Sequence, residues 1–241
     1  MKKIVFTMIG WYAFIMTMSM AFNSCEAGKR DGKGISSSAE STIVTGKPVA
    51  LDGSFDCIDI SGVDELTIAH GDSAQVTFQG DKEAIARFNV ANEDGVLVIK
   101  KKDNEKQRRH QQVKVHVVLP ELHKMTVAGV GSVVLQDEIK ADNLDIVANG
   151  CGSLRTKGIV CDKLKIEASG TSDIIIDGVT AQNAWLSANG VGSVNARFAD
   201  TVALDCSANG TGSVCLKGNV KSFNKESAGV GQFDTKQLVV E

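Results

Sequence analysis

Aromatic residues and proline are scarce in this chain, and their scarcity excludes several kinds of protein. The 241 residues include two prolines, one tyrosine and two tryptophans. Tyr12 and Trp11 lie in an apolar run at the N-terminus, so Trp185 is the one tryptophan or tyrosine of the remaining chain. Clefts that bind and cleave polysaccharides usually offer aromatic platforms to sugar rings. The composition therefore disfavours a polysaccharide-degrading enzyme.

A surplus of positive charge is also missing. The chain has 26 Lys and Arg residues against 29 Asp and Glu, and 24 basic residues remain without Lys2 and Lys3 of the N-terminal segment. A net negative domain repels phosphate backbones and anionic membrane surfaces. We therefore expect no nucleic-acid partner.

Patterns typical of metal sites, cofactor sites and disulfide frameworks are missing as well. No Cys-x-x-Cys pair is present, and His70, His116 and His123 are isolated along the chain. The sequence thus predicts no catalytic, cofactor-binding or metal-binding residue. Beyond Cys25 an odd number of cysteines remains, and their pairing is left open: Cys57, Cys151, Cys161, Cys206 and Cys215. Export would permit a disulfide, whereas the repeat described below favours a buried free thiol at Cys206.

The N-terminus has the layout of a secretory signal. Two lysines precede an apolar run over residues 4–22, and Ser24 and Cys25 follow it. This order predicts a signal peptide over residues 1–24. A small residue before Cys25 and a polar chain after it predict acylation of Cys25, as in bacterial lipoproteins. The two residues before Ser24 depart from the usual lipobox, so ordinary signal cleavage and an uncleaved anchor are alternatives.

The residues after Cys25 divide into a linker and a domain. Residues 25–49 are polar and small, and they cannot bury enough apolar surface to offset their ordering entropy, so we expect a flexible linker. Residues 50–241 have the length of one domain. We expect an exported cell-envelope protein, an outer membrane lipoprotein with a periplasmic or surface face, that contacts the membrane through its lipid anchor.

Six similar segments recur in the second half of the chain. Each resembles the segment Asn189-Gly190-Val191-Gly192-Ser193, and the first glycines stand at positions 129, 150, 170, 190, 210 and 229. The successive spacings are therefore 21, 20, 20, 20 and 19 residues. Such regular spacing indicates a repeat architecture.

Apolar and polar columns alternate around these glycines. Four residues before the glycine stand Met125, Ile146, Ile166, Leu186, Cys206 and Lys225. Four residues after it stand Val133, Leu154, Ile174, Val194, Val214 and Phe233. The column five residues before it is mostly polar: Lys124, Asp145, Lys165, Trp185, Asp205 and Asn224. Alternation with period two is typical of strands with one buried face, so each repeat should hold a strand on either side of a glycine turn.

Two folds fit this pattern. In a right-handed parallel β-helix each repeat is one coil, whereas an antiparallel array would use Asn-Gly at 149, 189 and 209 as hairpin turns. Polar turn columns recur as faithfully as apolar ones, which stacking of Asn and Ser side chains explains and hairpins do not require. Pro48 and Pro120 lie outside the repeats, as continuous backbone ladders require. The prediction is an all-β fold, a right-handed parallel β-helix of about six coils over residues 119–241.

Residues 50–118 do not follow the repeat. Short runs with period-two alternation predict an N-terminal β-strand layer that caps the first coil. The basic loop Lys100–Gln112 is interpreted as a solvated hairpin tip, because Asp103 and Glu105 interrupt its positive charge. At the other end, the weakened last repeat closes with Leu238–Val240, which we expect to form a C-terminal cap.

Three segments outside the repeats complete a resemblance to a known family. They are Phe55–Ile60, Asp94–Ile99 and Val115–Pro120, and they lead into the Gly-x-Gly-Ser copies. Together they resemble the head GIN domain family, labelled "putative auto-transporter adhesin" and common in Bacteroidetes lipoproteins. The resemblance covers about residues 50–241 and implies a right-handed β-helix. It transfers no catalytic residue.

Two functions fit these expectations. The first is a non-enzymatic surface or envelope module, an adhesin or scaffold with a glycan or surface protein as ligand. The alternative, a β-helix polysaccharide lyase or hydrolase, needs paired carboxylates, or a base beside Arg or Lys, on one exposed face. The outward columns offer scattered acidic candidates, interpreted as a solvated surface: Asp145, Glu167, Asp173, Asp205 and Glu226. We therefore expect no enzyme, and Trp185 is either a contact residue or a cover for its neighbours.

Overall fold

The computed structural model describes residues 43–46, 48–102, 112–229 and 231–241. Ser41–Glu241 form one compact unit. Most of the described residues belong to strands of one sheet, and the one helix among them is the single turn α2 (Lys82–Ile85). Asp81 caps this turn, because its carboxylate accepts hydrogen bonds from the backbone N–H groups of Glu83 and Ala84 at 2.9 and 3.1 Å. The predicted all-β class is confirmed.

The strands fall into two groups. Those before the repeats are β1 (Ile43–Thr45), β2 (Cys57–Ser61), β3 (Glu65–His70), β4 (Gln75–Asp81), β5 (Phe88–Glu93), β6 (Val96–Lys101) and β7 (Val113–Leu119). Those of the repeats are β8 (Lys124–Ala128), β9 (Ser132–Asn149), β10 (Ser153–Gly210), β11 (Ser213–Gly229) and β12 (Gln232–Val240).

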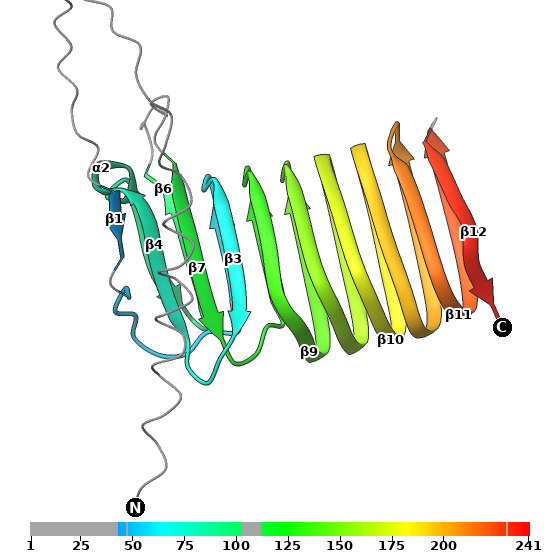
Figure 1. The fold of residues 1–241 in the computed structure, drawn as a ribbon, viewed down its shortest axis with the longest axis horizontal. Coiled ribbons are helices and arrows are strands. Elements are labelled where there is room, and N and C mark those ends of the chain that lie inside the picture. Colours follow the sequence, from blue (N-terminus) through cyan, green and yellow to red (C-terminus); the bar gives the residue numbers. More distant parts are fainter. Residues whose placement is uncertain (1–42, 47, 103–111, 230) are drawn as a thin grey trace, which may run out of the picture. The chain divides into compact units, whose positions relative to one another are not determined.

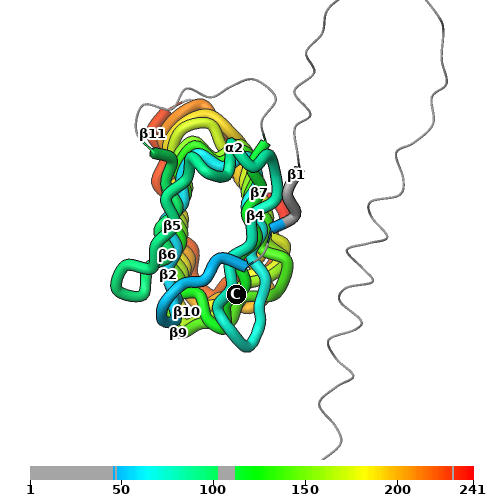
Figure 2. Tube along the Cα trace, turned by 90° about the vertical axis from the view of Figure 1, so that its left-hand side faces the viewer, coloured from blue at the N-terminus to red at the C-terminus, as the bar shows by residue number. Residues whose placement is uncertain are grey.

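Each repeat pairs in parallel with the next one, so that equivalent residues of the two repeats are register partners. Leu154 is the register partner of Val133, Val214 that of Val194, and Phe233 that of Val214. All pairings among β8–β12 are parallel, so an antiparallel hairpin array is excluded for them. Figure 1 shows the repeats as successive rungs from β9 to β12, and Figure 2 shows their traces superposed around a common ring.

The apolar column predicted before the glycine forms part of the core. Met125, Ile146 and Ile166 are register partners and are almost fully buried. Leu186 and Cys206 are buried in the same hydrophobic cluster. Burial of each large apolar side chain contributes about 1.5–3 kcal/mol, and no repeat can cover its own apolar face alone. The stack is therefore the unit of stability.

Glycine recurs at the turn because neighbouring backbones approach closely there. Gly210 has a φ of 143°, and a side chain at this position would collide with the carbonyl oxygen of Gly190 in the preceding repeat. The predicted stacking of polar turn residues is also present. Asn209 Nδ2 donates a hydrogen bond to Asn189 Oδ1 at 3.0 Å.

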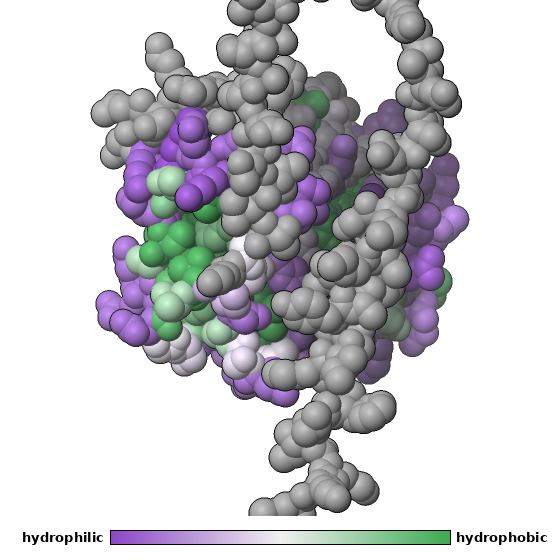
Figure 3. All heavy atoms as spheres, turned by 60° about the vertical axis from the view of Figure 1, so that its left-hand side comes forward, coloured by the Kyte–Doolittle hydropathy of each residue, from purple (hydrophilic) through white to green (hydrophobic). Residues whose placement is uncertain are grey.

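The N-terminal strands continue the stack before they close it. β2 pairs in parallel with β8 and β6, and β3 pairs in parallel with β9 and β7. The antiparallel strands β5, β4 and β1 then complete this end. The sheet thus includes β1, which lies within the segment expected to be a linker. Figure 3 shows an apolar area with hydrophilic borders at this end, where partly buried side chains pack against the core: Val49, Leu51, Ile85, Phe88 and Val90.

The last strand forms the C-terminal end of the stack. Leu238–Val240 belong to β12, which pairs with β11 and with no other described strand. Val239 and Val240 are 53% and 54% exposed. The last strand therefore adds a rung that covers residues 213–220 of β11, with Leu238 packed against the core, and no other described strand covers β12 in turn.

Candidate functional site

A groove of about 620 Å³ crosses the outside of the stack. Its lining comes from Glu121 and His123, from residues 140–142, 160–162 and 180–182, and from Asp200, Val202 and Lys221, which lie in successive repeats. Repeats stack about 4.8 Å apart, so a site that crosses six of them, with five spacings, is on the order of 20–25 Å long. The groove therefore fits an extended chain better than a compact molecule.

Stacking of small side chains forms the floor of this groove. Cys161 is the register partner of Ala141, and Ala181 lies in the equivalent place of the next repeat. Cys161 and Ala181 are buried. Their small size leaves space between the polar residues on either side, so the hollow repeats with the sequence.

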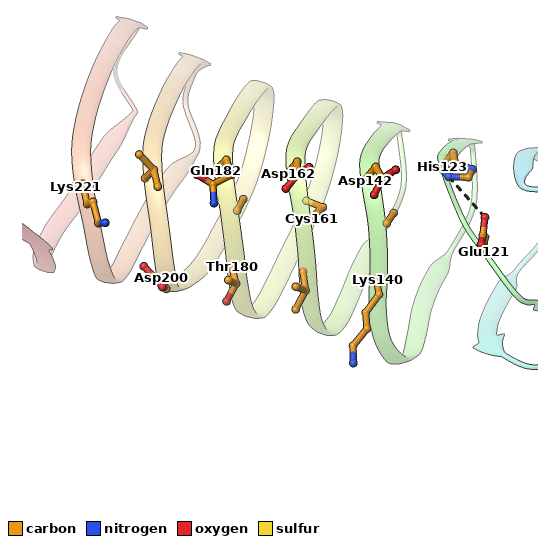
Figure 4. Close-up of a pocket in the computed structure, with 14 residues that line it drawn as sticks. Glu121, His123, Lys140, Asp142, Cys161, Asp162, Thr180, Gln182, Asp200 and Lys221 are labelled. Carbon is orange, nitrogen blue, oxygen red and sulfur yellow. Dashed lines mark ion pairs between the residues drawn. The ribbon is translucent and has the colours of Figure 1, made fainter.

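Two rows of polar side chains border the floor. In Figure 4, Asp142, Asp162 and Gln182 follow one another on successive strands, and Lys140, Thr180 and Asp200 form a second row. These carboxylate, amide and hydroxyl groups offer hydrogen-bond acceptors and donors at the spacing of the strands. None of the groove residues is aromatic.

The groove carries more negative than positive charge. Its carboxylates are Glu121, Asp142, Asp162 and Asp200, and its ammonium groups are Lys140 and Lys221. Within the described ranges, the carboxylates of Asp142, Asp162 and Asp200 accept no hydrogen bond and form no ion pair. Lys140 Nζ lies 3.5 Å from Glu138 Oε1, outside the groove lining. The three aspartates are therefore available to a ligand.

His123 lies at the N-terminal end of the groove. Its Nδ1 is 3.3 Å from Asp56 Oδ2, and its Nε2 is 3.9 Å from Glu121 Oε2. The backbone fixes its place, because the His123 N–H donates to the Asp56 carbonyl oxygen at 2.9 Å. The imidazole thus lies between the carboxylates of Asp56 and Glu121, and the 3.9 Å separation from Glu121 is longer than a hydrogen bond.

Cys161 is the groove residue with the chemistry of a nucleophile, and its surroundings suppress that chemistry. Burial, with a smaller contribution from the negative charge of Asp162, raises the pKa of the thiol to about 11. The thiolate is the reactive form of cysteine. Burial likewise raises the pKa of Cys206 to about 12. The five described cysteines are free, which confirms the prediction for Cys206.

The acidic residues singled out in the sequence lie in other places. Glu167 forms an ion pair with Lys165, whose Nζ is 2.8 Å away and also lies 5.1 Å from the Trp185 ring centroid. Asp145 is the register partner of Lys165, and its buried Oδ1 has no hydrogen-bond partner in the described structure. Trp185 is 37% exposed, so it both contacts its neighbour and presents a surface. These residues are not part of the groove lining.

Two other candidates have structural roles. Asp173 Oδ1 accepts hydrogen bonds from Ser193, from the backbone N–H at 3.1 Å and from Oγ at 2.7 Å, and so ties two repeats together. His116 is partly buried in β7, and burial lowers its pKa. Most of the basic loop, residues 103–111, lies outside the described residues. At its base, Lys100 pairs with Asp59 at 2.6 Å.

Within the described ranges, no group of three or more His, Cys, Asp or Glu side chains could hold a metal ion. Likewise, no helix of this part of the chain is long and apolar enough to cross a membrane.

A family model described as "putative auto-transporter adhesin, head GIN domain" matches residues 54–214 and 165–241. The chain belongs to the head GIN domain family. No curated protein matches the head GIN chain in sequence.

Solved structures share the fold of this head GIN domain. A "putative adhesin" from Bacteroides fragilis is 21% identical, with a TM-score of 0.58, over 86% of this chain and 100% of its own. A "putative adhesin" from Parabacteroides merdae is 18% identical, with a TM-score of 0.51, over 83% and 97% of the two chains. A "putative lipid binding protein" from Parabacteroides distasonis is 16% identical, with a TM-score of 0.50, over 80% and 96%.

The high pKa of Cys161 predicts slow alkylation of the folded protein. At pH 8 a thiol with a pKa of about 11 is ionised in about one molecule per thousand, against about one in four for a free cysteine. Labelling of Cys161 by iodoacetamide should therefore be about 100-fold slower than in the urea-unfolded chain. The rate should rise about tenfold per pH unit up to about pH 10. Mass spectrometry of the Cys161 peptide measures both rates, and equal rates at pH 8 would contradict the assignment.

Proposed function

We propose that this protein is a non-enzymatic envelope lipoprotein that binds an extended glycan along its groove, as an adhesin or scaffold. The observation that carries the proposal is the groove itself. Polar side chains recur along it from repeat to repeat, and the free carboxylates of Asp142, Asp162 and Asp200 can accept hydrogen bonds from hydroxyl or ammonium groups. Solenoid stacks characteristically bind ligands along such extended surfaces.

The supporting architecture is a right-handed parallel β-helix of about six coils, with the N-terminal strands as its first layers. The parallel one-repeat register and the ring of superposed traces support this description. In this arrangement the groove runs along the helix axis. A ligand that occupies it therefore contacts the same position of each coil.

A glycan fits this groove better than a peptide strand. A peptide that adds to a sheet needs an exposed backbone edge. The groove floor is built instead from side chains of paired strands, such as Ala141 of β9 and its register partner Cys161 of β10. Recognition in the groove must therefore come from side chains. The excess of carboxylates favours neutral or amine-bearing chains over uronate polymers.

Membrane attachment completes the proposal. We infer that the signal over residues 1–24 is removed, that Cys25 is acylated, and that residues 25 to about 42 link the anchor to the folded unit. This places the domain in the cell envelope, on the periplasmic or surface face of the outer membrane. The anchor and the linker rest on the sequence, because residues 1–42 lie outside the described structure.

Neutralising the groove should weaken glycan binding. The purified chain from residue 25 onward, with Cys25→Ser, is titrated with mannan, chitosan oligosaccharides and alginate by calorimetry. We expect binding to mannan or chitosan, and an affinity about 30-fold lower for Asp142→Asn/Asp162→Asn, because two lost charged hydrogen bonds at about 1 kcal/mol each cost about 2 kcal/mol. Asp177→Asn is the matched control, since it makes the same change on an exposed residue outside the groove.

Three results would overturn this function. They are no binding to any of these glycans, equal binding by the groove variant and the control, and release of new reducing ends from a bound polysaccharide. The last would instead support the alternative, a polysaccharide lyase or hydrolase.

Acylation has its own test. Cells that express the full chain are labelled with an alkyne-tagged fatty acid, and the protein is then partitioned in a detergent that phase-separates on warming. We expect the natural chain to carry the fatty-acid label and to partition into the detergent phase. Cys25→Ser should lose both properties, whereas Cys57→Ser should keep both. Retention of label after Cys25→Ser contradicts the assigned anchor.

A further inference from the structure

The interior column before the glycine changes character at the last repeat. Five of its members are buried and uncharged: Met125, Ile146, Ile166, Leu186 and Cys206. The sixth is Lys225, which is the register partner of Cys206 and is exposed. The neighbouring column changes in the same way, since Ala208 is partnered by Ser227. The change from apolar to polar residues therefore affects both core columns in this strand.

This change of residue type occurs at the C-terminal end of the stack. Residues 213–220 of β11 pair with β10 and β12, whereas residues 222–229 pair with β10 and with no other described strand. β12 likewise has one neighbour in the part of the chain that the structure describes. In Figure 1, β11 and β12 form the terminal rung. A parallel backbone edge of this kind is a template for another strand.

Lys225 reaches over the end of the core instead of leaving it open. Its Nζ lies 4.2 Å from the centroid of the Phe233 ring, which belongs to the apolar column after the glycine. The methylene groups of a lysine can cover apolar surface while the ammonium stays in water. The ammonium is also attracted to the face of an aromatic ring. One side chain thus spans from one wall of the interior to the other.

We propose that Lys225 is a gatekeeper that prevents a second copy of this chain from stacking on the C-terminal end. A second copy placed there would enclose the ammonium without an acidic partner inside the apolar column, which is strongly unfavourable. Inward-pointing charges are one of the means by which sheet proteins protect their edges. Without Lys225, the unpaired edge, Phe233 and the exposed Val239 and Val240 would leave an apolar end with no charge to oppose another copy.

Replacement of Lys225 by leucine tests the proposal. The chain from residue 25 onward, with Cys25→Ser, is used because residues 41–241 form a compact unit with its own core. Its mass is measured by light scattering and sedimentation from 1 to about 200 µM. The natural residue should give a monomer that does not associate through this end, and Lys225→Leu should self-associate at least about tenfold more tightly, with circular dichroism confirming the fold.

Matched variants separate the gatekeeper from a general effect of charge. Lys221→Leu removes the same charge from the same terminal strand, but in the groove and outside the interior column, and it should stay monomeric. Lys225→Arg keeps a cation at the end and should also stay monomeric. Lys225→Leu/Val239→Lys returns a charge to this end and should restore the monomer.

Three outcomes would overturn the proposal. They are a folded Lys225→Leu that remains monomeric at 200 µM, equal association by Lys221→Leu, and a natural chain that already associates through β12. If Lys225→Leu does not fold, Lys225→Gln replaces it and should associate more tightly than Lys225→Arg.

Discussion

Parallel backbone hydrogen bonding at a shift of one repeat is the constraint on which this structure depends. It places most residues of β9 beside the residue of β10 about twenty positions further along the chain. The residues of one column must then be similar in size and polarity, because each packs between the equivalent residues of the two neighbouring repeats. Large apolar residues are required inside, and glycine is required where two turns approach most closely, as at Gly190 and Gly210.

The same constraint produces the surface features. A small residue repeated at one place, as with Ala141, Cys161 and Ala181, makes a continuous groove, because the neighbouring repeats carry equally small residues and cannot fill the space. Polar residues beside it, such as Asp142 and Asp162, then recur at strand spacing along one line. The groove is therefore a consequence of the repeat, and its chemistry can differ among proteins that share the fold. The identities of 16–21% to solved relatives fit that view, since they support a common fold alone.

Much of the fold could be predicted because short stretches of the sequence encode it. Period-two alternation and equal glycine spacing identify the strands, and the stacking of Asn189 on Asn209 follows from the repeat. The N-terminal strand order could not be predicted, since β3 lies between β7 and β9 only after long-range pairing. The turn of α2 depends on one capping residue, Asp81, and gives no periodic signal.

The groove was missed for a related reason. Its residues lie about twelve positions after the glycine, where repeats of 21 and 19 residues shift the columns and the register slips near residues 156–158 and 198–201. A column drawn eight residues before each glycine, instead of after it, would have shown Asp142, Asp162 and Gln182 together. The contact of His123 with Asp56 joins residues far apart in sequence, and no single-chain pattern reveals it.

Engineered disulfides across the repeats test the parallel register most directly. Ser132 and Ser153 are register partners whose hydroxyl oxygens lie 3.3 Å apart, so Ser132→Cys/Ser153→Cys should cross-link fully under mild oxidation. Ser132→Cys/Ser193→Cys, about 14 Å apart if three repeats separate them, should not. Mass spectrometry of the oxidised peptides distinguishes the two. Cross-linking of the distant pair, or none of the adjacent one, would contradict the stacked arrangement.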